Sequence, residues 1–514
     1  MRIVLVNWAR VWDGASHGGG INGYTQGLAL ELVARGHEVY SLCGGTAYEA
    51  GGGPGDGGGA RAIGPCRIIR HPDWLGIRVA EVVNSPVSAP SLAQFRDPEG
   101  EVASATLEAR VGEFVREVRP DAVHVQSLEG FTAGCVGAIR RAAPRARVVF
   151  SLHNYHPICP QVYLLQGHRR ACVDFRGGEA CAGCVEAPDP ARHRREAAGI
   201  KEAADGFESV RAVAGWHESM PMVAERRGCI AEINQQRLPP VWSGVDLPAR
   251  RPVPNVVPDE RQEPTNEYGR RRAAMVAALN SCDRVLAVSE FVRAMYESKG
   301  VRAGVMRTLH IGCRLSDVVA SRPESSVPPP PMVEGGEPRA VRAVFMGYHN
   351  WYKGLPMLLE SLELLTPEVL SRLHLSVIAL GGEHAEAEVR RMEPRLAGLR
   401  VVHGYRYHDL PWVLSGTDVG LVPSVWWDNG PQTVLEYQAC GIPVIGAALG
   451  GIADFVRHGQ DGLLFRGNDR YDLARTLAGV LRRPGCLESL RAGVRRPKGM
   501  SAHAAEMERE YAAA

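Results

Sequence analysis

The sequence has no surplus of charge of either sign, which excludes one large group of functions. Its 59 Lys and Arg residues are nearly balanced by 57 Asp and Glu residues. A chain that recruits nucleic acid through a long-range positive field carries a marked excess of basic residues. We therefore expect no nucleic-acid partner, and the charge identifies no other polymeric ligand.

Long apolar runs are also absent. A membrane-spanning helix needs about 18 or more consecutive apolar residues, and no stretch of the sequence approaches that length. The first apolar run, residues 1–6, soon reaches Asn7 and Arg10 and lacks the basic flank and the length of a signal peptide. We expect a cytoplasmic protein, with peripheral association at the inner face of a membrane left open.

Cysteine is scarce for a disulfide-stabilised protein, with 12 residues in a chain of 514. Cytoplasmic thiols stay reduced, so we expect no disulfide framework. A chain this long also exceeds what a single hydrophobic core normally supports. The sequence therefore predicts at least two domains.

Short β-branched runs alternate with helical segments, and this alternation is typical of parallel α/β domains. In the first half we expect buried strands at residues 2–7, 38–42, 122–126, 147–152 and 284–288, with a helix at 24–35. The series restarts in the second half, at residues 343–346, 373–380, 399–402, 419–422 and 443–446. The sequence thus predicts two doubly wound sheets.

A proline- and glycine-rich stretch marks the domain boundary, because it continues neither helix nor sheet. We assign residues 1–325 to the first domain, 326–338 to a linker and 339–498 to the second domain. Residues 499–514 predict a helix that packs back on the first domain. An irregular stretch at about 187–267 predicts an insertion in the first domain.

A second glycine-rich segment covers residues 44–64. Glycine is costly to order, so this segment predicts a mobile surface loop after the second strand.

The most informative segment is residues 422–462, VPSVWWDNGPQTVLEYQACGIPVIGAALGGIADFVRHGQDG. A strand leads to a polar loop and then to a helix that starts near Pro431 and stops at Gly441. Such a helix N-terminus faces the carboxyl edge of the sheet, where its free N–H groups attract phosphate. We therefore expect Gln432, Thr433 and Val434 to face a diphosphate, with Glu436 near ribose hydroxyls.

This segment resembles the donor-site signature of the retaining GT-B glycosyltransferases of family 4, also called glycosyl transferases group 1. The signature is an acidic residue, seven residues and a Glu, here Asp428 and Glu436, followed by Gly-x-Pro-Val and a Gly-Gly turn. GYHNWYKG at 347–354 looks like the family's strand-end loop, whose lysine neutralises the donor diphosphate. HGGGING at 17–23 resembles the family's glycine loop. Further segments that resemble the family's first domain are residues 120–126, 151–157 and 286–292.

The resemblance implies a GT-B fold, in which two Rossmann-like doubly wound domains face each other across a cleft. It implies transfer of a sugar from a nucleotide-diphosphate-sugar with retention of configuration, and no cofactor requirement for catalysis. The acceptor, a glycan, a lipid-linked molecule or a natural product, is not identified. The residues that inherit catalytic roles are Lys353, Asp428 and His153. The donor-binding set is Gly19, Gly20, Lys353, Asp428, Asn429, Gly430, Pro431, Gln432, Thr433, Val434 and Glu436.

Several positions depart from the family pattern. Asp428 stands where relatives commonly carry Glu, and Gln126 stands where some relatives have a donor-contacting His. Tyr348 and His349 stand where a second basic residue often precedes the lysine. These departures leave open a catalytically silent GT-B protein that binds nucleotide-sugar or assists a partner. Another GT-B enzyme, such as a nucleotide-sugar epimerase or a phosphorylase, is a further alternative.

Four cysteines fall in one compact stretch after His153, with the spacing C-x12-C-x8-C-x2-C. They are Cys159, Cys172, Cys181 and Cys184. Four thiolates can hold a tetrahedral zinc ion, and C-x2-C is a common half-site. The spacing predicts a structural zinc site, while separate thiols or a redox-sensitive disulfide remain alternatives.

Overall fold

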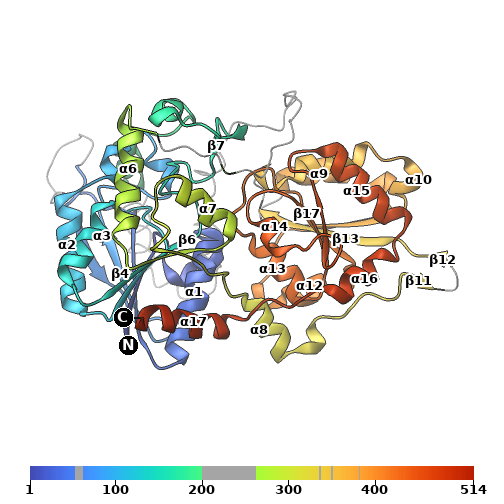
Figure 1. Ribbon diagram of the computed structural model, residues 1–514, viewed down its shortest axis with the longest axis horizontal. Helices are drawn as coiled ribbons and strands as arrows, with labels where there is room; N and C mark the ends of the chain where they lie inside the picture. The colour runs from blue at the N-terminus through green and yellow to red at the C-terminus, as the bar shows by residue number, and fades with distance from the viewer. Residues whose placement is uncertain are drawn as a thin grey trace, which may run out of the picture.

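The computed structural model describes residues 1–51, 62–199, 257, 262–334, 337–348, 351–380 and 383–513. They form two α/β domains that lie side by side, each built on its own sheet (Figure 1). Among the described helices, none combines the length and the apolar character that a bilayer crossing requires.

The first domain is built on an eight-stranded sheet with the order β10-β9-β6-β5-β1-β2-β4-β3. All neighbouring strands are parallel except the antiparallel pair β3 and β4. The strands are β1 (Arg2–Val6), β2 (Glu38–Ala47), β3 (Arg67–Arg70), β4 (Ile77–Val83), β5 (Ala122–Val125), β6 (Arg147–Leu152), β9 (Arg284–Ala287) and β10 (Met306–Thr308). Parallel strands are covered on both faces, and the side chains of Ile3, Val4 and Leu5 in β1 are accordingly buried.

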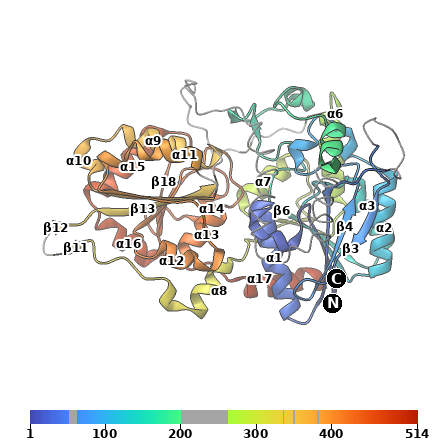
Figure 2. The same ribbon diagram turned by 180° about the vertical axis from the view of Figure 1, so that it is seen from behind.

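Helices connect these strands and cover the sheet on both sides (Figures 1 and 2). They are α1 (Gly19–Ala34), α2 (Ala105–Val118), α3 (Gly134–Ala142), α6 (Glu267–Asn280) and α7 (Glu290–Ser298). Helix α8 (Arg314–Ser321) follows β10 and lies next to the second domain (Figure 1). The Ser104, Asn266 and Ser289 side chains cap α2, α6 and α7 by accepting hydrogen bonds from first-turn N–H groups.

The second domain has a six-stranded, fully parallel sheet with the order β15-β14-β13-β16-β17-β18. Its strands are β13 (Val341–Tyr348), β14 (Leu373–Leu380), β15 (Gly398–Val402), β16 (Val419–Val422), β17 (Val444–Ala447) and β18 (Gly462–Phe465). Its helices are α9 (Leu355–Glu363), α10 (Pro367–Leu370), α11 (Glu383–Arg390), α12 (Leu410–Leu414), α13 (Gln432–Ala439), α14 (Ile452–Phe455), α15 (Arg470–Arg482) and α16 (Cys486–Gly493). Figure 2 shows α9, α10 and α15 on one face of this sheet and α12, α13 and α16 on the other.

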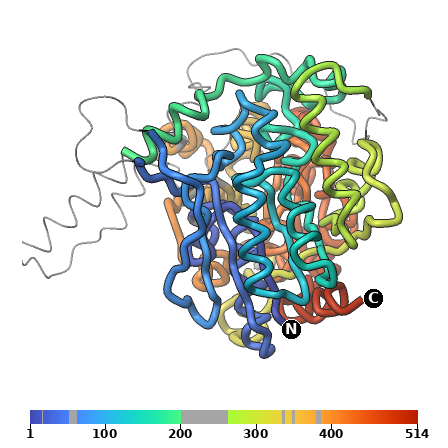
Figure 3. The backbone as a smooth tube through the Cα atoms, turned by 90° about the vertical axis from the view of Figure 1, so that its left-hand side faces the viewer, coloured from blue at the N-terminus to red at the C-terminus, as the bar shows by residue number. Residues whose placement is uncertain are grey.

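The last helix, α17 (Met500–Ala512), returns from the second domain and packs against α1 and β6 of the first. Tyr511 Oη lies 2.7 Å from His124 Nδ1, and His503 Nε2 lies 2.7 Å from Tyr24 Oη. His124 is completely buried in β5 and also bonds Ser151 Oγ at 2.8 Å, so its role is structural. Figure 3 shows the two ends of the chain next to each other on this domain.

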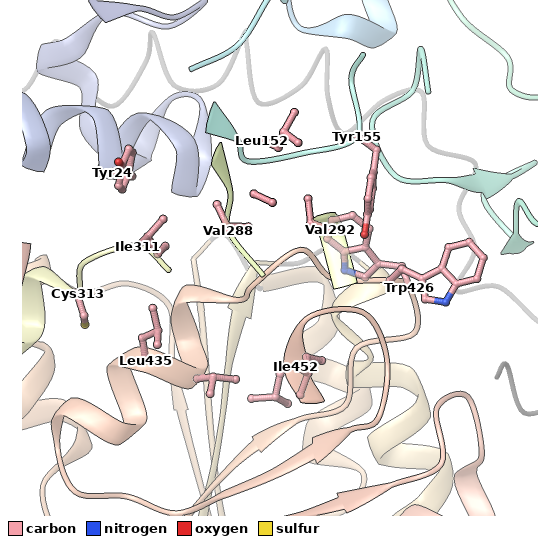
Figure 4. Close-up of a cluster of buried hydrophobic side chains, with 14 of the residues drawn as sticks. Tyr24, Leu152, Tyr155, Val288, Val292, Ile311, Cys313, Trp426, Leu435 and Ile452 are labelled. Carbon is pink, nitrogen blue, oxygen red and sulfur yellow. The ribbon is translucent and has the colours of Figure 1, made fainter. Parts of the chain in front are cut away.

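An apolar cluster joins the two domains (Figure 4). Val288, Val292 and Ile311 of the first domain lie above Leu435 and Ile452 of the second. All five side chains are buried. Burial of apolar surface is the main source of cohesion between packed elements, so the domain contact is part of the hydrophobic core.

The prediction of a surface loop at residues 44–64 is wrong for its first part, because β2 continues to Ala47. Gly44 pairs with Val82 of β4, and the backbone of Gly45 (φ +92°) lies against Gly130 so closely that a Cβ would approach it to 2.5 Å. Glycine is needed there for close packing rather than for mobility. Residues 52–61 of the predicted loop lie outside the described residues, as do residues 200–256 and 258–261 of the predicted insertion.

Candidate active site

The predicted site residues of the two domains meet at the domain interface. Gln432 Nε2, at the start of α13, donates a hydrogen bond to the carbonyl oxygen of Gly20 at 2.8 Å. Gly20 lies in the first turn of α1. The N-terminus of α13 and the glycine loop therefore face each other beyond the carboxyl ends of β1 and β16, the edge at which open α/β sheets bind ligands.

Gly18 and Gly19, at the start of α1, have different surroundings. Gly18 has φ +89°, and a Cβ there would lie 2.8 Å from the Cβ of Ala9. Gly19 has φ +60° and no atom within 4 Å of an added Cβ. Gly18 is thus required by the fold, whereas Gly19 leaves the backbone open to a ligand.

Lys353 and Asp428 form an ion pair, with Nζ 2.9 Å from Oδ2. Ser424 Oγ also donates to Asp428 Oδ2 at 3.3 Å, and Lys353 Nζ lies 5.6 Å from the ring centroid of Trp426. Lys353 ends the short helix Trp351–Lys353 after β13, and the next residue, Gly354, has φ +87° and packs on Pro423. The ammonium group is held at the carboxyl edge of the sheet, where an anionic ligand would compete with Asp428 for it.

Glu436 is buried, with 5% of its surface exposed. Burial raises the pKa of Glu436 to about 7, although a hydrogen bond with Tyr407 and the charge of Lys353 act to lower it. A glutamate at this place in a helix would by itself suggest a solvent-facing residue, and the burial of Glu436 excludes that reading. A carboxyl group with this pKa changes its charge near neutral pH, which is typical of functional sites.

Loop residues 428–431 lead into α13. Pro431 is its N-cap and supplies no side-chain hydrogen bond to the first turn. The N–H of Val434 donates to the Pro431 carbonyl at 3.1 Å. The N–H groups of Gln432 and Thr433 are therefore better placed to donate hydrogen bonds to a phosphate. Gly430 packs against Phe455, 3.0 Å from an added Cβ.

His153 follows β6 and lies beside Tyr24, with ring centroids 4.5 Å apart. Its Nε2 is 2.7 Å from Gln126 Oε1, which is an acceptor, so Nε2 carries the hydrogen. Burial, with a contribution from the charge of His503, lowers the pKa of His153 to about 3. The imidazole is therefore neutral at physiological pH, with Nδ1 as a hydrogen-bond acceptor.

Several buried polar groups near the interface have no partner within the described residues. They are Gln126 Nε2, Tyr155 Oη, Trp426 Nε1, and both Nδ2 and Oδ1 of Asn429. A buried polar group without a hydrogen bond is costly. These groups are suited to receive the hydroxyls of a polar ligand.

The predicted zinc site is not supported. All four cysteines lie in the described residues as free thiols, and no three His, Cys, Asp or Glu side chains there are arranged to hold a metal ion. Burial, together with neighbouring thiols, raises the pKa of Cys172 and Cys181 to about 12, so both are protonated. Cys181 packs in an apolar cluster with Phe175 and Tyr268, and C-x2-C spacing alone does not distinguish such a cluster from a metal site.

Residues that the sequence did not mark as site residues form hydrogen bonds between the domains near this site. Tyr352 Oη donates to Tyr163 Oη of the first domain at 3.0 Å, next to Lys353. Ser289 and Phe291 at the start of α7 bond to the second domain. The helix-cap signal of Ser289 was visible in the sequence, but a contact between domains has no local signal. His349 lies outside the described residues.

Two surface hollows lie away from this interface. One is lined by Tyr40, His71 and Arg78, the other by Leu365, Val369 and Ala474. Neither contains a predicted site residue, so we assign function to the interface.

Two protein-family models match the chain. The model described as glycosyl transferase 4-like domain matches residues 19–220, and the model described as glycosyl transferases group 1 matches residues 340–483. One match falls in each domain. The family models therefore agree with the division of the chain into two sheets.

Curated relatives include the D-inositol 3-phosphate glycosyltransferases of Geodermatophilus obscurus and Thermobispora bispora. The first is 36% identical over 172 residues, which is 31% of this chain and 37% of the relative. The second is 38% identical over 136 residues, or 26% of this chain and 29% of the relative. The chain thus matches only about a third of the length of these relatives.

Solved structures resemble the whole chain. Sucrose-phosphate synthase from Thermosynechococcus elongatus is 16% identical, with a TM-score of 0.57 over 99% of this chain and 98% of that one. HepE from Anabaena, in complex with UDP and glucose, is 14% identical, with a TM-score of 0.53 over all of both chains. At this identity the likeness concerns the fold.

The two Rossmann-like sheets, with the predicted site loops meeting between them, place the chain in the GT-B fold class. Within that class, the chain belongs to the family 4 type, the glycosyl transferases group 1.

Proposed function

We propose that the protein is a retaining glycosyltransferase, which moves a sugar from a nucleoside diphosphate onto a hydroxyl group of a glycan, lipid-linked or small-molecule acceptor. The observation that carries the proposal is the position of Lys353, paired with Asp428 at 2.9 Å and next to the loop that begins α13. An ammonium group beside a helix N-terminus is a suitable place for a diphosphate leaving group.

The donor's diphosphate binds between Lys353, the N–H groups of Gln432 and Thr433, and the open backbone at Gly19 and Gly20. Lys353 then exchanges its ion pair with Asp428 for the phosphate oxygens. Glu436 accepts hydrogen bonds from the ribose hydroxyls, which favours its ionised form. Negative charge that develops on the leaving phosphate meets fixed positive groups, and this stabilises the transition state.

The freed Asp428 carboxylate and the Asn429 amide hold hydroxyl groups of the donor sugar. The support for this role is that Asn429 is 4% exposed and its amide has no partner within the described residues. His153, neutral and held by Gln126, offers Nδ1 as an acceptor for a further hydroxyl. Its low pKa makes it unsuited to act as a general base.

The acceptor hydroxyl attacks the anomeric carbon from the face that the diphosphate leaves. The bond from the anomeric carbon to the phosphate oxygen breaks, and that oxygen accepts the acceptor's proton. Retention follows from attack and departure on one face. Contact between the domains excludes water and limits donor hydrolysis.

The proposal is tested by calorimetric titration with UDP and UDP-glucose, chosen because the related fold of HepE holds UDP and glucose. Lys353→Ala and Glu436→Ala should each weaken UDP binding at least tenfold, since each removes a charged contact. Lys299→Ala, at the end of α7, is the matched control and should bind as the wild type does.

Turnover is then measured with UDP-glucose and D-inositol 3-phosphate, the acceptor in the names of the curated relatives. An α-linked product from the α-linked donor supports retention, and a β-linked product contradicts it. A protein that binds none of a panel of nucleoside diphosphate sugars would overturn the proposal in favour of an auxiliary role.

A further inference from the structure

The N-terminus of α7, in the first domain, contacts the loop before α13 and the helix α14 of the second. Ser289 is the N-cap of this helix, and its Oγ accepts a hydrogen bond from the N–H of Val292 at 3.3 Å. The same hydroxyl donates to the carbonyl oxygen of Asn429 at 2.6 Å. The buried Ser289 hydroxyl therefore caps a helix in the first domain and also bonds the loop that leads into α13 in the second.

A second hydrogen bond lies beside the first. The N–H of Phe291 donates to Asp454 Oδ2 at 3.1 Å, and Asp454 belongs to α14 in the second domain. Burial raises the pKa of Asp454, while the N–H groups of Phe291 and Glu290 act to lower it. The carboxylate meets the positive end of α7, an arrangement that favours its charged form.

The Asp428–Asn429 loop and the Gly450–Gly451 turn of the second domain pack closely on each other. Gly451 N donates to the Asp428 carbonyl at 2.7 Å. A Cβ on Gly451 would lie 2.6 Å from Ser289 Oγ and 2.2 Å from the Asn429 carbonyl oxygen, and one on Gly450 would lie 2.2 Å from the Asp428 carbonyl oxygen. The Asp428–Asn429 backbone, the glycine pair and Ser289 thus form one close-packed block.

This block fixes the backbone that carries two predicted donor contacts. The carbonyl groups of Asp428 and Asn429 are both engaged, so the directions of the two side chains are set. Asp428 points to Lys353, and the Asn429 amide is buried without a partner among the described residues. Small displacements of such groups have large effects on a bound substrate.

We propose that Ser289 and Asp454 are positioning residues, which hold the Asp428–Asn429 loop in its donor-binding geometry through the N-terminus of α7. The inference rests on the proposed function, because it assumes that this loop binds the donor sugar. It extends that function by making donor recognition in the second domain depend on contact with the first.

The test uses Ser289→Ala, Asp454→Ala and Asp454→Asn, because Asn keeps an oxygen that accepts from Phe291 N–H. The first two variants should raise the KM for UDP-glucose, and thereby lower kcat/KM, by about tenfold. This is the effect of one lost hydrogen bond. Asp454→Asn should restore most of the loss. Ser298→Ala, at the other end of α7, has its hydroxyl bonded within the helix and should act as the wild type does.

Hydrogen exchange in the protein without substrate separates this inference from the proposed function. The peptide covering residues 425–435 should exchange faster in Ser289→Ala and Asp454→Ala than in the wild type and Ser298→Ala. Unchanged exchange and unchanged donor KM in both variants would overturn the positioning role. A wild-type protein that binds no nucleotide sugar instead overturns the proposed function, whatever the exchange result.

Discussion

At the scale of single residues, Glu436 shows how burial gives a common side chain a special property. Its carboxyl group is buried, and its neighbours offset only part of the desolvation that raises its pKa to about 7. The charge of this group therefore changes near neutral pH.

The first prediction concerns the pH dependence of nucleotide binding. Ionised Glu436 is the stronger acceptor for ribose hydroxyls, so UDP affinity should rise between pH 6 and pH 8. In Glu436→Gln the charge change is removed, and affinity should be weak and nearly independent of pH over this range. Calorimetric titration at several pH values measures both, and an equal pH dependence in the two proteins contradicts the assignment.

Stability should follow the opposite trend. The folded pKa of Glu436 lies above the unfolded value, so the native state binds the proton more tightly and loses stability as pH rises from about 4.5 to about 7. Glu436→Gln should therefore be more stable than the wild type at pH 8, by up to about 3 kcal/mol. Thermal unfolding at pH 5 and pH 8 checks this, and the difference should be largest at pH 8.

The second prediction concerns His153. Since its pKa is lowered to about 3, protonation of His153 should not appear in the pH–rate profile between pH 5 and pH 9. His153→Gln keeps an acceptor and should retain more activity than His153→Ala. A rate that falls with a pKa near 6.5 in the wild type, and not in His153→Gln, would contradict a neutral histidine.

At the scale of helices and strands, regular patterns in the sequence were informative. Residues 147–152, 373–380 and 419–422 were predicted as strands and form β6, β14 and β16 with the same limits. These are apolar runs whose burial on both sheet faces is visible locally. The short β3, Arg67–Arg70, was not predicted, because its four residues begin and end with arginine and give no such signal.

Contacts between residues that are far apart in the sequence could not be predicted from local patterns. The glycines at the end of β2 have poor strand propensity. The close approach of Val82 and Phe131 to Gly44, and of Gly130 and Ala89 to Gly45, explains them. The residues of the candidate donor site could be proposed from the sequence, because the spacing of Asp428 and Glu436 resembles the family signature. Their environment could not, because the burial of Glu436 beside Tyr407 and the bond from Ser289 to Asn429 depend on chain folding.

The third prediction concerns the attachment of α6. Arg271 is completely buried and pairs with Glu101, which also bonds His156 Nε2 at 2.7 Å. Arg271→Met leaves the Glu101 carboxylate without its main partner and should cost about 3–5 kcal/mol in the free energy of unfolding. Urea denaturation measures this loss. The neighbouring Arg270→Ala is the control, because its pair with Glu99 is exposed and should contribute about 1 kcal/mol or less.

The same network predicts the acid sensitivity of the first domain. Although burial acts to raise it, the charges of Arg271 and His156 and their hydrogen bonds lower the pKa of Glu101 to about 2. This pKa is below the unfolded value, so the stabilisation is present above about pH 4.5 and is lost as pH falls toward 2. In Arg271→Met, stability should depend less on pH over that range.

At the scale of the whole molecule, the two domains are held together by apolar contacts and by the chain itself. The chain passes from the first domain to the second before β13 and returns before α17. The returning helix buries Ala504, Met507 and Tyr511. The last helix in the sequence therefore belongs to the core of the first domain.

The fourth prediction follows from this arrangement. Removal of residues 499–514 exposes apolar surface of α1 and β6 and leaves His124 Nδ1 and Tyr24 Oη without their partners in α17. The first domain should unfold at a lower temperature, while the second should change little. Calorimetry with limited proteolysis separates the two transitions, and a chain that ends at Ala512 is the control. An unchanged first transition in the shortened chain would contradict a structural role for α17.

The adjacency of Met1 and α17 bears on how the chain can be rearranged. Met1 N lies 3.1 Å from His37 Nδ1, and the other nitrogen of this ring lies 2.7 Å from Glu508. A circular permutant that joins these ends through a short linker and opens between residues 326 and 332, where the chain has neither helix nor strand, keeps every element of each domain. The two lobes are then connected by one covalent crossing in place of two. Such a permutant should retain the fold of both domains while the angle between them varies more widely. It therefore measures how far the covalent connections, rather than the surface contact, fix the relative position of the two domains.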